Sequence, residues 1–365
     1  MNDSANLRKE LRPPGVVSAS CPSCVFFDRC GGIQNSRPLL NCFDQFCCGG
    51  GKCDNVCPYN SDFMDRLREI NGLCFDGIPT LKQEAGLDLP AYAPLIHHRY
   101  SRAKPLSLPF ASVELYDLFR LKRGKYECVA NSPDELRAHF KLGSETKIVL
   151  RGTAVDESLE RYWSYRKTNN VAEKIARLDV SLVIGPNFST FLDVPRTDAL
   201  FNRKRQLMCL AELSEHGVSV ATHLSATMPA DWRFWKSYLN DNPQLRYIAL
   251  NCQTGYKTPT EGQKAICTIA TIQQNIGREL FLVLVGGAQF TKFASRRFKH
   301  VSLIDSEPFA KTMRRRRMVN SGAKRRWEES WSLKGQPLDE LMSDNIGLYS
   351  GWTHQQLNGN QAALT

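Results

Sequence analysis

Short apolar runs that recur along the second half of the chain constrain its fold more than any other feature. Each run has four to six residues, which is too short for a buried helix, and most are rich in β-branched side chains. Between most of them lie longer stretches with helical periodicity, such as residues 198–215, which end before Gly217. Strands that alternate with helices imply parallel pairing through right-handed crossovers. The runs occupy residues 147–150, 180–184, 218–221, 247–250, 280–285 and 301–304.

A further strand is expected at residues 126–129, ahead of a helix for which Ser132 is the expected N-cap. The resulting six or seven strand–helix repeats predict an α/β fold with a parallel (β/α)-barrel-like domain, and a doubly wound open sheet is the alternative. The chain contains no GxGxxG or GxxxxGK[ST] loop, which disfavours a dinucleotide or P-loop site.

The composition is that of a globular protein, with 42% hydrophobic and 23% charged residues. The longest apolar run is far shorter than the ~20 residues that cross a bilayer, so no membrane association is expected. The first residues include charges and prolines and lack the apolar core of a secretion signal, so a cytoplasmic location is expected.

The chain divides into five predicted regions. We expect a flexible tail at 1–20, a cysteine-rich metal module at 21–58, and a barrel-like domain at 110–310. Residues 59–109 are expected to form a short helix, with Ser61 as its N-cap, and a proline-rich linker. A basic C-terminal segment occupies 311–365.

Eight of the thirteen cysteines lie within 37 residues of the N-terminal part. In a reducing compartment, such clustered thiols bind metal more often than they form disulfides. Thiolates suit tetrahedral zinc or an iron–sulfur cluster, and the spacing leaves both open. The radical-SAM spacing is absent, because Asn60 stands where a third cysteine would follow Cys53 and Cys57. The predicted metal ligands are Cys21, Cys24, Cys30, Cys42, Cys47, Cys48, Cys53 and Cys57.

Positive charge is concentrated in one segment. Residues 291–326 hold twelve Lys and Arg against the two acids Asp305 and Glu307, so they carry +10 of the formal net charge of +11. Such a block attracts polyanions, and nucleic acid, either DNA or RNA, is the partner it favours. Trp327 and Trp331 follow the block, where they could stack on bases or mark a buried helix face. The predicted nucleic-acid-binding residues are Arg296, Arg297, Arg314, Arg315, Arg316, Arg317, Lys324, Arg325 and Arg326.

Polar residues stand just past the apolar runs, where the strands of a parallel barrel would converge on one mouth. His223 is a candidate acid or base near neutral pH, and Asp305 or Glu307 is a candidate base or nucleophile. Asn187 lies in a loop that would line the mouth. No HxH or HExxH motif is present, which argues against a second metal there. The remaining members of this set are Arg151, Asn251, Cys252 and Gln289.

The stretch from 183 to 225 resembles a bacterial and phage family known as domain of unknown function 4417. The resemblance spans roughly residues 145–290 and implies a barrel-like α/β fold and an association with mobile elements or defence against phage. It implies no particular reaction, and the cysteine module lies outside it. The matching positions are Pro186, Asn187, Phe188, Ser189, Pro195, Asn202, Arg205 and Gly217, with Asn187 where the family more often has Asp.

Three functional hypotheses follow. The first is an enzyme that acts on nucleic acid or a nucleotide, such as a base-modifying enzyme, with its site at the barrel mouth. The second is a nucleic-acid-binding or partner-binding scaffold that carries a structural metal. The third is an iron–sulfur redox or sensor protein.

Overall fold

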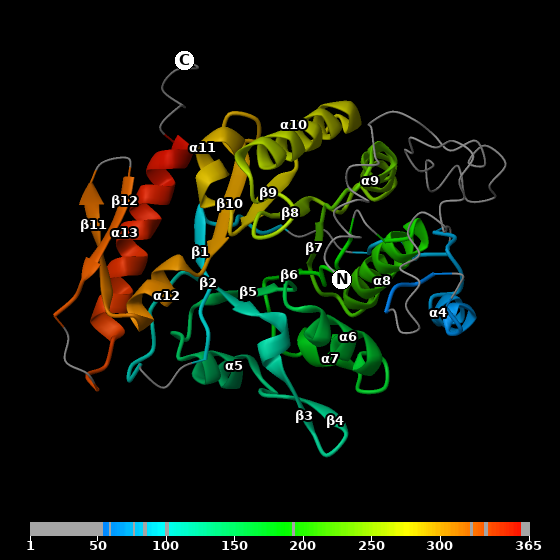
Figure 1. Cartoon of the computed structure of the whole chain (residues 1–365). Coiled ribbons are helices and arrows are strands. Elements are labelled where there is room, and N and C mark those ends of the chain that lie inside the picture. Colours follow the sequence, from blue (N-terminus) through cyan, green and yellow to red (C-terminus); the bar gives the residue numbers. More distant parts are fainter. Residues whose placement is uncertain are drawn as a thin grey trace, which may run out of the picture. The chain divides into compact units, whose positions relative to one another are not determined.

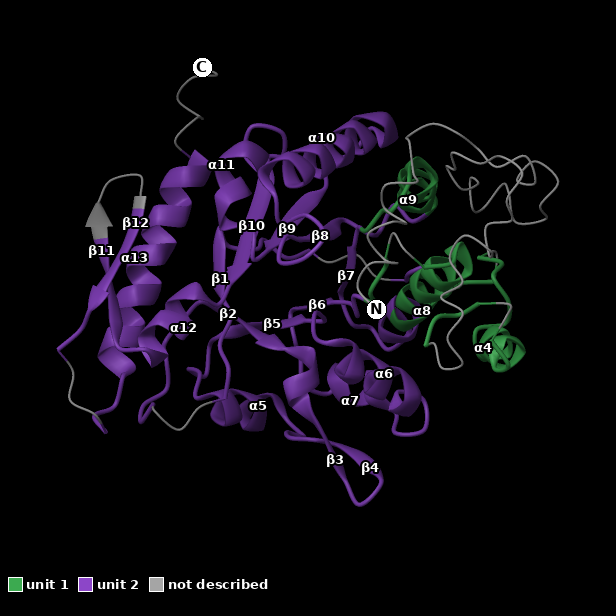
Figure 2. Cartoon of the chain, in the orientation of Figure 1, with its two compact units in different colours: residues 1–80, 188–209, 225–241 green, residues 81–187, 210–224, 242–365 purple. Residues whose placement is uncertain are grey.

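The computed structural model describes residues 54–57, 60–75, 77–82, 86–98, 102–191, 194–321, 324–331 and 335–358 (Figure 1). They belong to two compact units (Figure 2). Unit 1 comprises residues 1–80, 188–209 and 225–241. Unit 2 comprises residues 81–187, 210–224 and 242–365.

The core of unit 2 is a parallel sheet of eight strands that follow one another around a barrel in chain order. The hydrogen-bonded order is β1-β10-β9-β8-β7-β6-β5-β2, and every pair is parallel. The first and last strands of this order meet in a bridge between Leu95 and Ser112, where the Ile96 N–H donates to the Ser112 carbonyl at 2.8 Å. The strands are β1 (Tyr92–Pro94), β2 (Phe110–Glu114), β5 (Lys147–Arg151), β6 (Leu182–Ile184), β7 (Val220–His223), β8 (Tyr247–Asn251), β9 (Phe281–Val285) and β10 (His300–Asp305).

This arrangement confirms the predicted α/β barrel-like fold, which resembles a TIM barrel, and excludes the open doubly wound sheet. Buried side chains from seven of the eight strands fill the interior, and Phe110 of β2 packs against them. Most of these side chains are aliphatic, so the barrel is a packed core without a channel. The barrel begins earlier than predicted, because β1 lies inside the segment that we expected to be a linker.

Most connections between the strands are helical. The expected N-cap of α5 is confirmed, since the Ser132 hydroxyl accepts the Glu135 N–H. The candidate strand at 126–129 is β4, which pairs antiparallel with β3 outside the barrel. The connecting elements of unit 2 are η1 (Leu115–Leu118), β3 (Phe119–Lys122), β4 (Lys125–Cys128), α5 (Pro133–Phe140), α6 (Asp156–Tyr165), α7 (Val171–Ala176), α10 (Pro259–Ile276), η2 (Ala288–Phe290), α11 (Thr291–Ala294) and α12 (Glu307–Met313).

After α12 the basic segment folds into a two-stranded antiparallel hairpin, and a long helix ends the described chain. The hairpin consists of β11 (Arg316–Ser321) and β12 (Lys324–Glu329), and the helix is α13 (Asp339–Asn358). Asn345 of α13 fixes the hairpin to the helix, because its side-chain oxygen accepts the Met318 N–H at 2.8 Å and its amide donates to the Arg316 carbonyl at 2.8 Å.

Unit 1 contains α4 (Phe63–Glu69), most of α8 (Arg196–Glu215) and α9 (Pro229–Asp241). Asp62, and not Ser61, is the cap residue of α4. A fully buried carboxylate, Asp231, joins α9 to α8 by pairing with Arg196 and with Arg203, whose Nη2 lies 2.7 Å from Oδ1. Burial alone would raise the pKa of Asp231, but the two guanidinium groups outweigh it and hold the pKa well below its usual value.

Candidate functional site at the barrel mouth

Four polar side chains project into the barrel at the carboxyl ends of its strands. Side chains alternate along a strand, and Val149, Ala221 and Ala249 belong to the interior core. The residues two positions further on therefore also face inward. These are Arg151, His223 and Asn251, and Glu114 of β2 joins them as the register partner of Arg151.

Arg151 and Glu114 form a nearly buried ion pair at the centre of this group. Arg151 Nε donates to Glu114 Oε2 at 3.0 Å and Nη2 donates to Oε1, which makes the pair bidentate. The two side chains are only 8% and 12% exposed. A third donor, Nη1, reaches Oε1 of Gln253 at 3.3 Å. Burial raises the pKa of the Glu114 carboxyl, although the Arg151 charge opposes this shift.

His223 lies beside the ion pair as a neutral ring. It is 1% exposed, and its Nε2 lies 3.2 Å from the Thr153 hydroxyl. Burial, reinforced by the positive charge of Arg151, lowers the pKa of His223 to about 3. The ring therefore acts at neutral pH as a hydrogen-bonding group, and not as the near-neutral acid or base expected from its residue type.

The loop after β8 completes one side of the mouth. The Asn251 side-chain oxygen accepts the Gln253 N–H at 3.1 Å, which turns the chain back over the barrel end. Gly286 has a φ of +65°, and a Cβ there would lie 2.5 Å from Gln253 Cγ, so glycine permits this approach. Cys252 is buried, and burial raises its pKa to about 12, so it is a protonated thiol and not a nucleophile.

Asp305 and Glu307 lie outside this group. Ile304 faces the interior, so its neighbour Asp305 faces outward, where Oδ2 accepts the Tyr349 hydroxyl of α13 at 2.7 Å and Oδ1 accepts the Glu307 N–H at 2.8 Å. The Glu307 carboxylate accepts Arg325 Nη1 at 2.6 Å and Trp327 Nε1 at 2.9 Å. Both acids therefore attach the hairpin and α13 to the barrel, which is a structural use.

The two other predicted mouth residues are at its edge. The Asn187 N–H donates to the Gly152 carbonyl at 2.8 Å, which places Asn187 next to the end of β5, and its side chain is half-buried. Gln289 lies in η2 and is exposed.

The basic block is only partly a free surface. Arg325 is bound to Glu307, and Arg297 stacks on Phe293 with 3.6 Å between the guanidinium carbon and the ring centre. Two glutamates follow the block at the end of β12 and pair in register with arginines of β11. Glu329 lies opposite Arg316, and Glu328 lies opposite Arg317. The remaining predicted binders divide by exposure: Arg296, Arg314, Arg316, Arg317 and Arg326 are exposed, Arg315 is half-buried, and Lys324 begins β12.

The cysteine module lies outside the described residues except for its last member. Cys57 is buried, and the chain just before it is attached to the start of α8. The Val56 N–H donates to Asp198 Oδ1 at 2.8 Å, and the Thr197 hydroxyl donates to the Val56 carbonyl at 2.6 Å. Within the described ranges, no three His, Cys, Asp or Glu side chains are grouped as a metal site would require.

Sequence reasoning missed Glu114, Thr153 and Gln253. Glu114 ends a strand that was not recognised, and the other two lie two residues beyond the strand ends. Among the described helices none is long and apolar enough to span a membrane. Comparison with protein-family models, curated proteins and solved structures finds no match for this chain.

Proposed function

We propose that the protein is an enzyme that acts on a nucleotide or on a base of a nucleic acid, with its active site at the barrel mouth. The observation that carries this proposal is the inward-facing group of Glu114, Arg151, His223 and Asn251 at the carboxyl ends of parallel strands. Enzymes with barrels of this type have their active sites at that end. A setting in mobile elements or phage defence, which the sequence resemblance to domain of unknown function 4417 would imply, is part of this proposal.

The chemistry of the group suits proton transfer on a polar heterocycle. Glu114 is the proton-transfer group, because a buried carboxyl with a raised pKa is closer to the operating pH than an exposed one. Arg151 and the amides of Asn251 and Gln253 supply hydrogen-bond donors and acceptors that are complementary to those on the edge of a base. A base within a duplex would have to leave the stack to reach the interior of the barrel.

The exposed arginines of the hairpin are the proposed contacts to phosphates. Arg316, Arg317 and Arg326 are exposed, and Trp331 directly after the hairpin is fully exposed and available to stack on a base. Glu328 lies 3.3 Å from Arg326, so part of this charge is compensated within the hairpin. The contribution to binding is therefore electrostatic and dependent on salt.

We also propose that the cysteines of residues 21–58 hold zinc or an iron–sulfur cluster. The support for this proposal is the sequence itself, in which eight cysteines fall within 37 residues, because thiolates are the ligands that both kinds of centre use. Metal analysis and a visible spectrum of anaerobically purified protein distinguish a brown iron–sulfur protein, as a redox sensor requires, from a colourless zinc protein.

The enzymatic proposal is tested by incubating the protein with cellular DNA and RNA, digesting both to nucleosides and searching for a mass change. We expect Glu114→Gln to abolish the change while nucleic-acid binding persists, and Glu127→Gln, at an exposed carboxylate of β4, to leave both intact. A Glu114→Gln protein with full turnover would disprove the role of the mouth. Binding without any mass change in the wild type would favour the scaffold.

The phosphate contacts are tested separately. Replacing Arg316, Arg317 and Arg326 by Gln should weaken binding to all sequences alike and should lower the salt slope by about one for each phosphate that an arginine no longer neutralises. An unchanged slope would remove the hairpin from the binding surface.

A further inference from the structure

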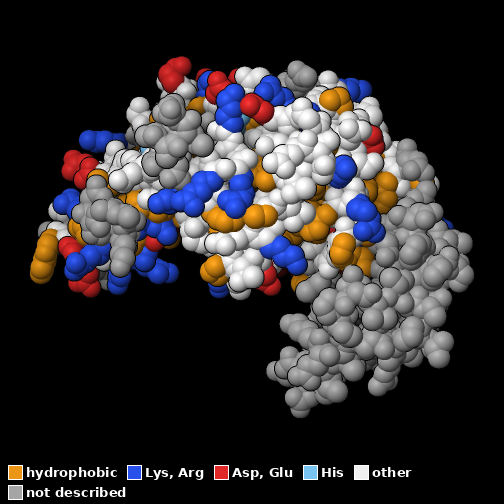
Figure 3. All heavy atoms as spheres, turned by 90° about the horizontal axis from the view of Figure 1, so that it is seen from above, with side chains coloured by type: hydrophobic (Ala, Val, Ile, Leu, Met, Phe, Trp, Pro, Cys, Tyr) orange, Lys and Arg blue, Asp and Glu red, His pale blue; other side chains and the backbone are white. Residues whose placement is uncertain are grey.

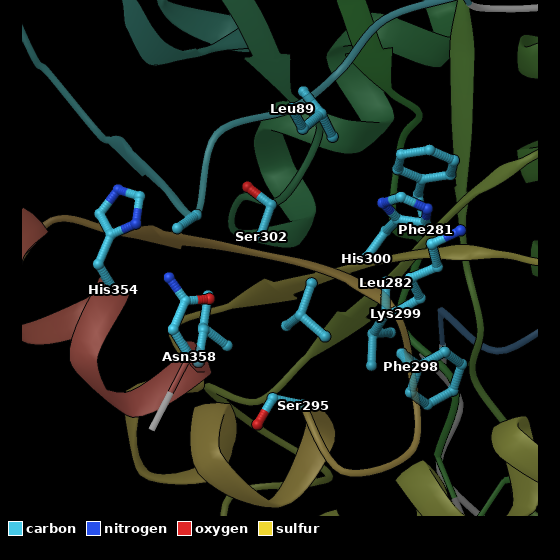
Figure 4. A pocket seen from close by; sticks show the side chains of 13 residues that line it. Leu89, Phe281, Leu282, Ser295, Phe298, Lys299, His300, Ser302, His354 and Asn358 are labelled. Atoms are coloured by element: carbon cyan, nitrogen blue, oxygen red, sulfur yellow. The ribbon is translucent and has the colours of Figure 1, made fainter. Parts of the chain in front are cut away.

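A polar cavity lies at the end of the barrel opposite the mouth. It has a volume of about 260 Å³ and is lined by the starts of β9 and β10, by Leu89 and Ala91, and by the last turns of α13 (Figure 4). None of the polar residues at the barrel mouth lines it. Its volume is just below the ~300–1,000 Å³ of typical ligand pockets, which suits a small molecule.

Ser302 of β10 is a buried polar group without a partner. It is 4% exposed, and its hydroxyl oxygen has no hydrogen-bond partner among the described residues. Figure 4 shows it between two walls, with His354 and Asn358 of α13 on one side and His300 and Phe281 on the other. A buried hydroxyl without a partner costs free energy unless a bound molecule satisfies it.

The charges around the cavity are mainly positive. Lys299 lines it, and Lys292 and Arg296 are exposed on either side of another lining residue, Ser295. Figure 3, which views the molecule from above relative to Figure 1, shows Lys and Arg side chains spread over that face among hydrophobic and uncharged ones, with some Asp and Glu side chains between them. Two acids reach this region: Glu279 lies 3.3 Å from Lys299 and 3.4 Å from His300, and Asp88 is exposed next to the lining residue Leu89.

The carboxyl end of α13 offsets the positive charge around the cavity only weakly. A helix carries roughly half a negative elementary charge at its carboxyl end. Arg246 lies 5.1 Å from the ring centre of the lining residue Phe281, so that with Lys292, Arg296 and Lys299 there are four full positive charges. They outweigh this partial charge and the two acids together.

We propose that this cavity binds a small metabolite that carries a phosphate group. The Ser302 hydroxyl, the His354 ring and the Lys299 ammonium would donate to the phosphate oxygens, and the Asn358 amide would face the remainder of the molecule. A phosphate accepts several such bonds at once, which matches donors that come from two sides of the cavity.

The test measures binding to the full chain by calorimetry, with inorganic phosphate and glycerol 3-phosphate as probes. Glycerol and sodium chloride at equal ionic strength are the controls for the probes. We expect saturable binding of both phosphates, weakened about tenfold or more by Ser302→Ala and by His354→Ala. His216→Ala, at an exposed histidine elsewhere in unit 2, should bind like the wild type.

Three results would overturn the proposal. The first is a heat of phosphate binding no larger than that given by chloride. The second is equal phosphate affinity of the wild type and the His354→Ala protein. The third is loss of phosphate binding only when Arg316, Arg317 and Arg326 are replaced. The last result would assign the phosphate to the hairpin, so that failure of this proposal and failure of the hairpin as a nucleic-acid contact can be distinguished.

Discussion

Three variants test whether the ion pair of Glu114 and Arg151 stabilises the barrel mouth. They are Glu114→Gln, Arg151→Met and the double variant. The pair is bidentate and its side chains are 8% and 12% exposed, so each single change leaves a nearly buried group without its partner. Removing one member of a buried pair costs about 3–5 kcal/mol. In the Glu114→Gln variant Arg151 keeps its bond to Gln253, so we expect the lower figure, about 3 kcal/mol. Arg151→Met removes the donor of both Glu114 and Gln253, so we expect a cost nearer the upper figure, about 5 kcal/mol.

The double variant removes both charges, and its cost should be well below the sum of the two single costs. We expect a coupling energy of about 2–3 kcal/mol, at the upper end of values for residues in contact. Urea unfolding followed by circular dichroism gives the free energies of unfolding of all four proteins. Single costs under about 1 kcal/mol, or additivity within about 0.5 kcal/mol, would refute the description of a buried, mutually dependent pair.

Three further changes have expected outcomes. His223 has a folded pKa of about 3, below its unfolded value, so the stability that it contributes is complete above pH ~6.5 and is lost at lower pH as the unfolded state binds a proton. The free energy of unfolding should therefore fall by about 2–3 kcal/mol between pH 6.5 and pH 4.5. This part of the pH dependence should be absent in His223→Gln. Asp231 has a lowered pKa, so the stability that it contributes is complete above pH ~4 and is lost as the pH falls towards the folded pKa. Asp231→Asn should lower the free energy of unfolding by about 3–5 kcal/mol, measured in urea at neutral pH. A cost below about 1 kcal/mol would contradict the pairing of Asp231 with two arginines. Ser302→Ala should raise the melting temperature in phosphate-free buffer, because it removes a buried hydroxyl worth about 1 kcal/mol or more of desolvation, and a lower melting temperature would show that the hydroxyl has a partner.

Six of the eight barrel strands could be predicted from sequence because parallel barrel strands are buried on both faces and are therefore continuously apolar. β1 was missed because it has three residues and ends at Pro94, in a segment whose prolines indicated irregular chain. β4 was predicted to be a strand, but its antiparallel pairing with β3 outside the barrel was not predicted. Its buried Tyr126 lies between the exposed Lys125 and Glu127, which is the alternation of a strand with one solvated face.

The candidate site was partly predictable for a related reason. His223, Asn251 and Arg151 follow apolar runs and were expected at the mouth. Asp305 also follows a run, but one position separates inward from outward side chains, and the register that decides this is set by pairing between strands. Glu114 could not be found because its strand was not recognised.

The junction between β1 and β2 has a consequence for how the barrel opens. Among the described residues, these two strands are joined by the single bridge at Leu95 and Ser112, whereas β10 and β9 pair over five positions. Local unfolding starts where backbone pairing is sparsest. The amide of Ile96 should therefore exchange with deuterium before those of β8 and β9, and the exposed edges of β1 and β2 would then be the place where this chain begins to associate with other copies when it is heated.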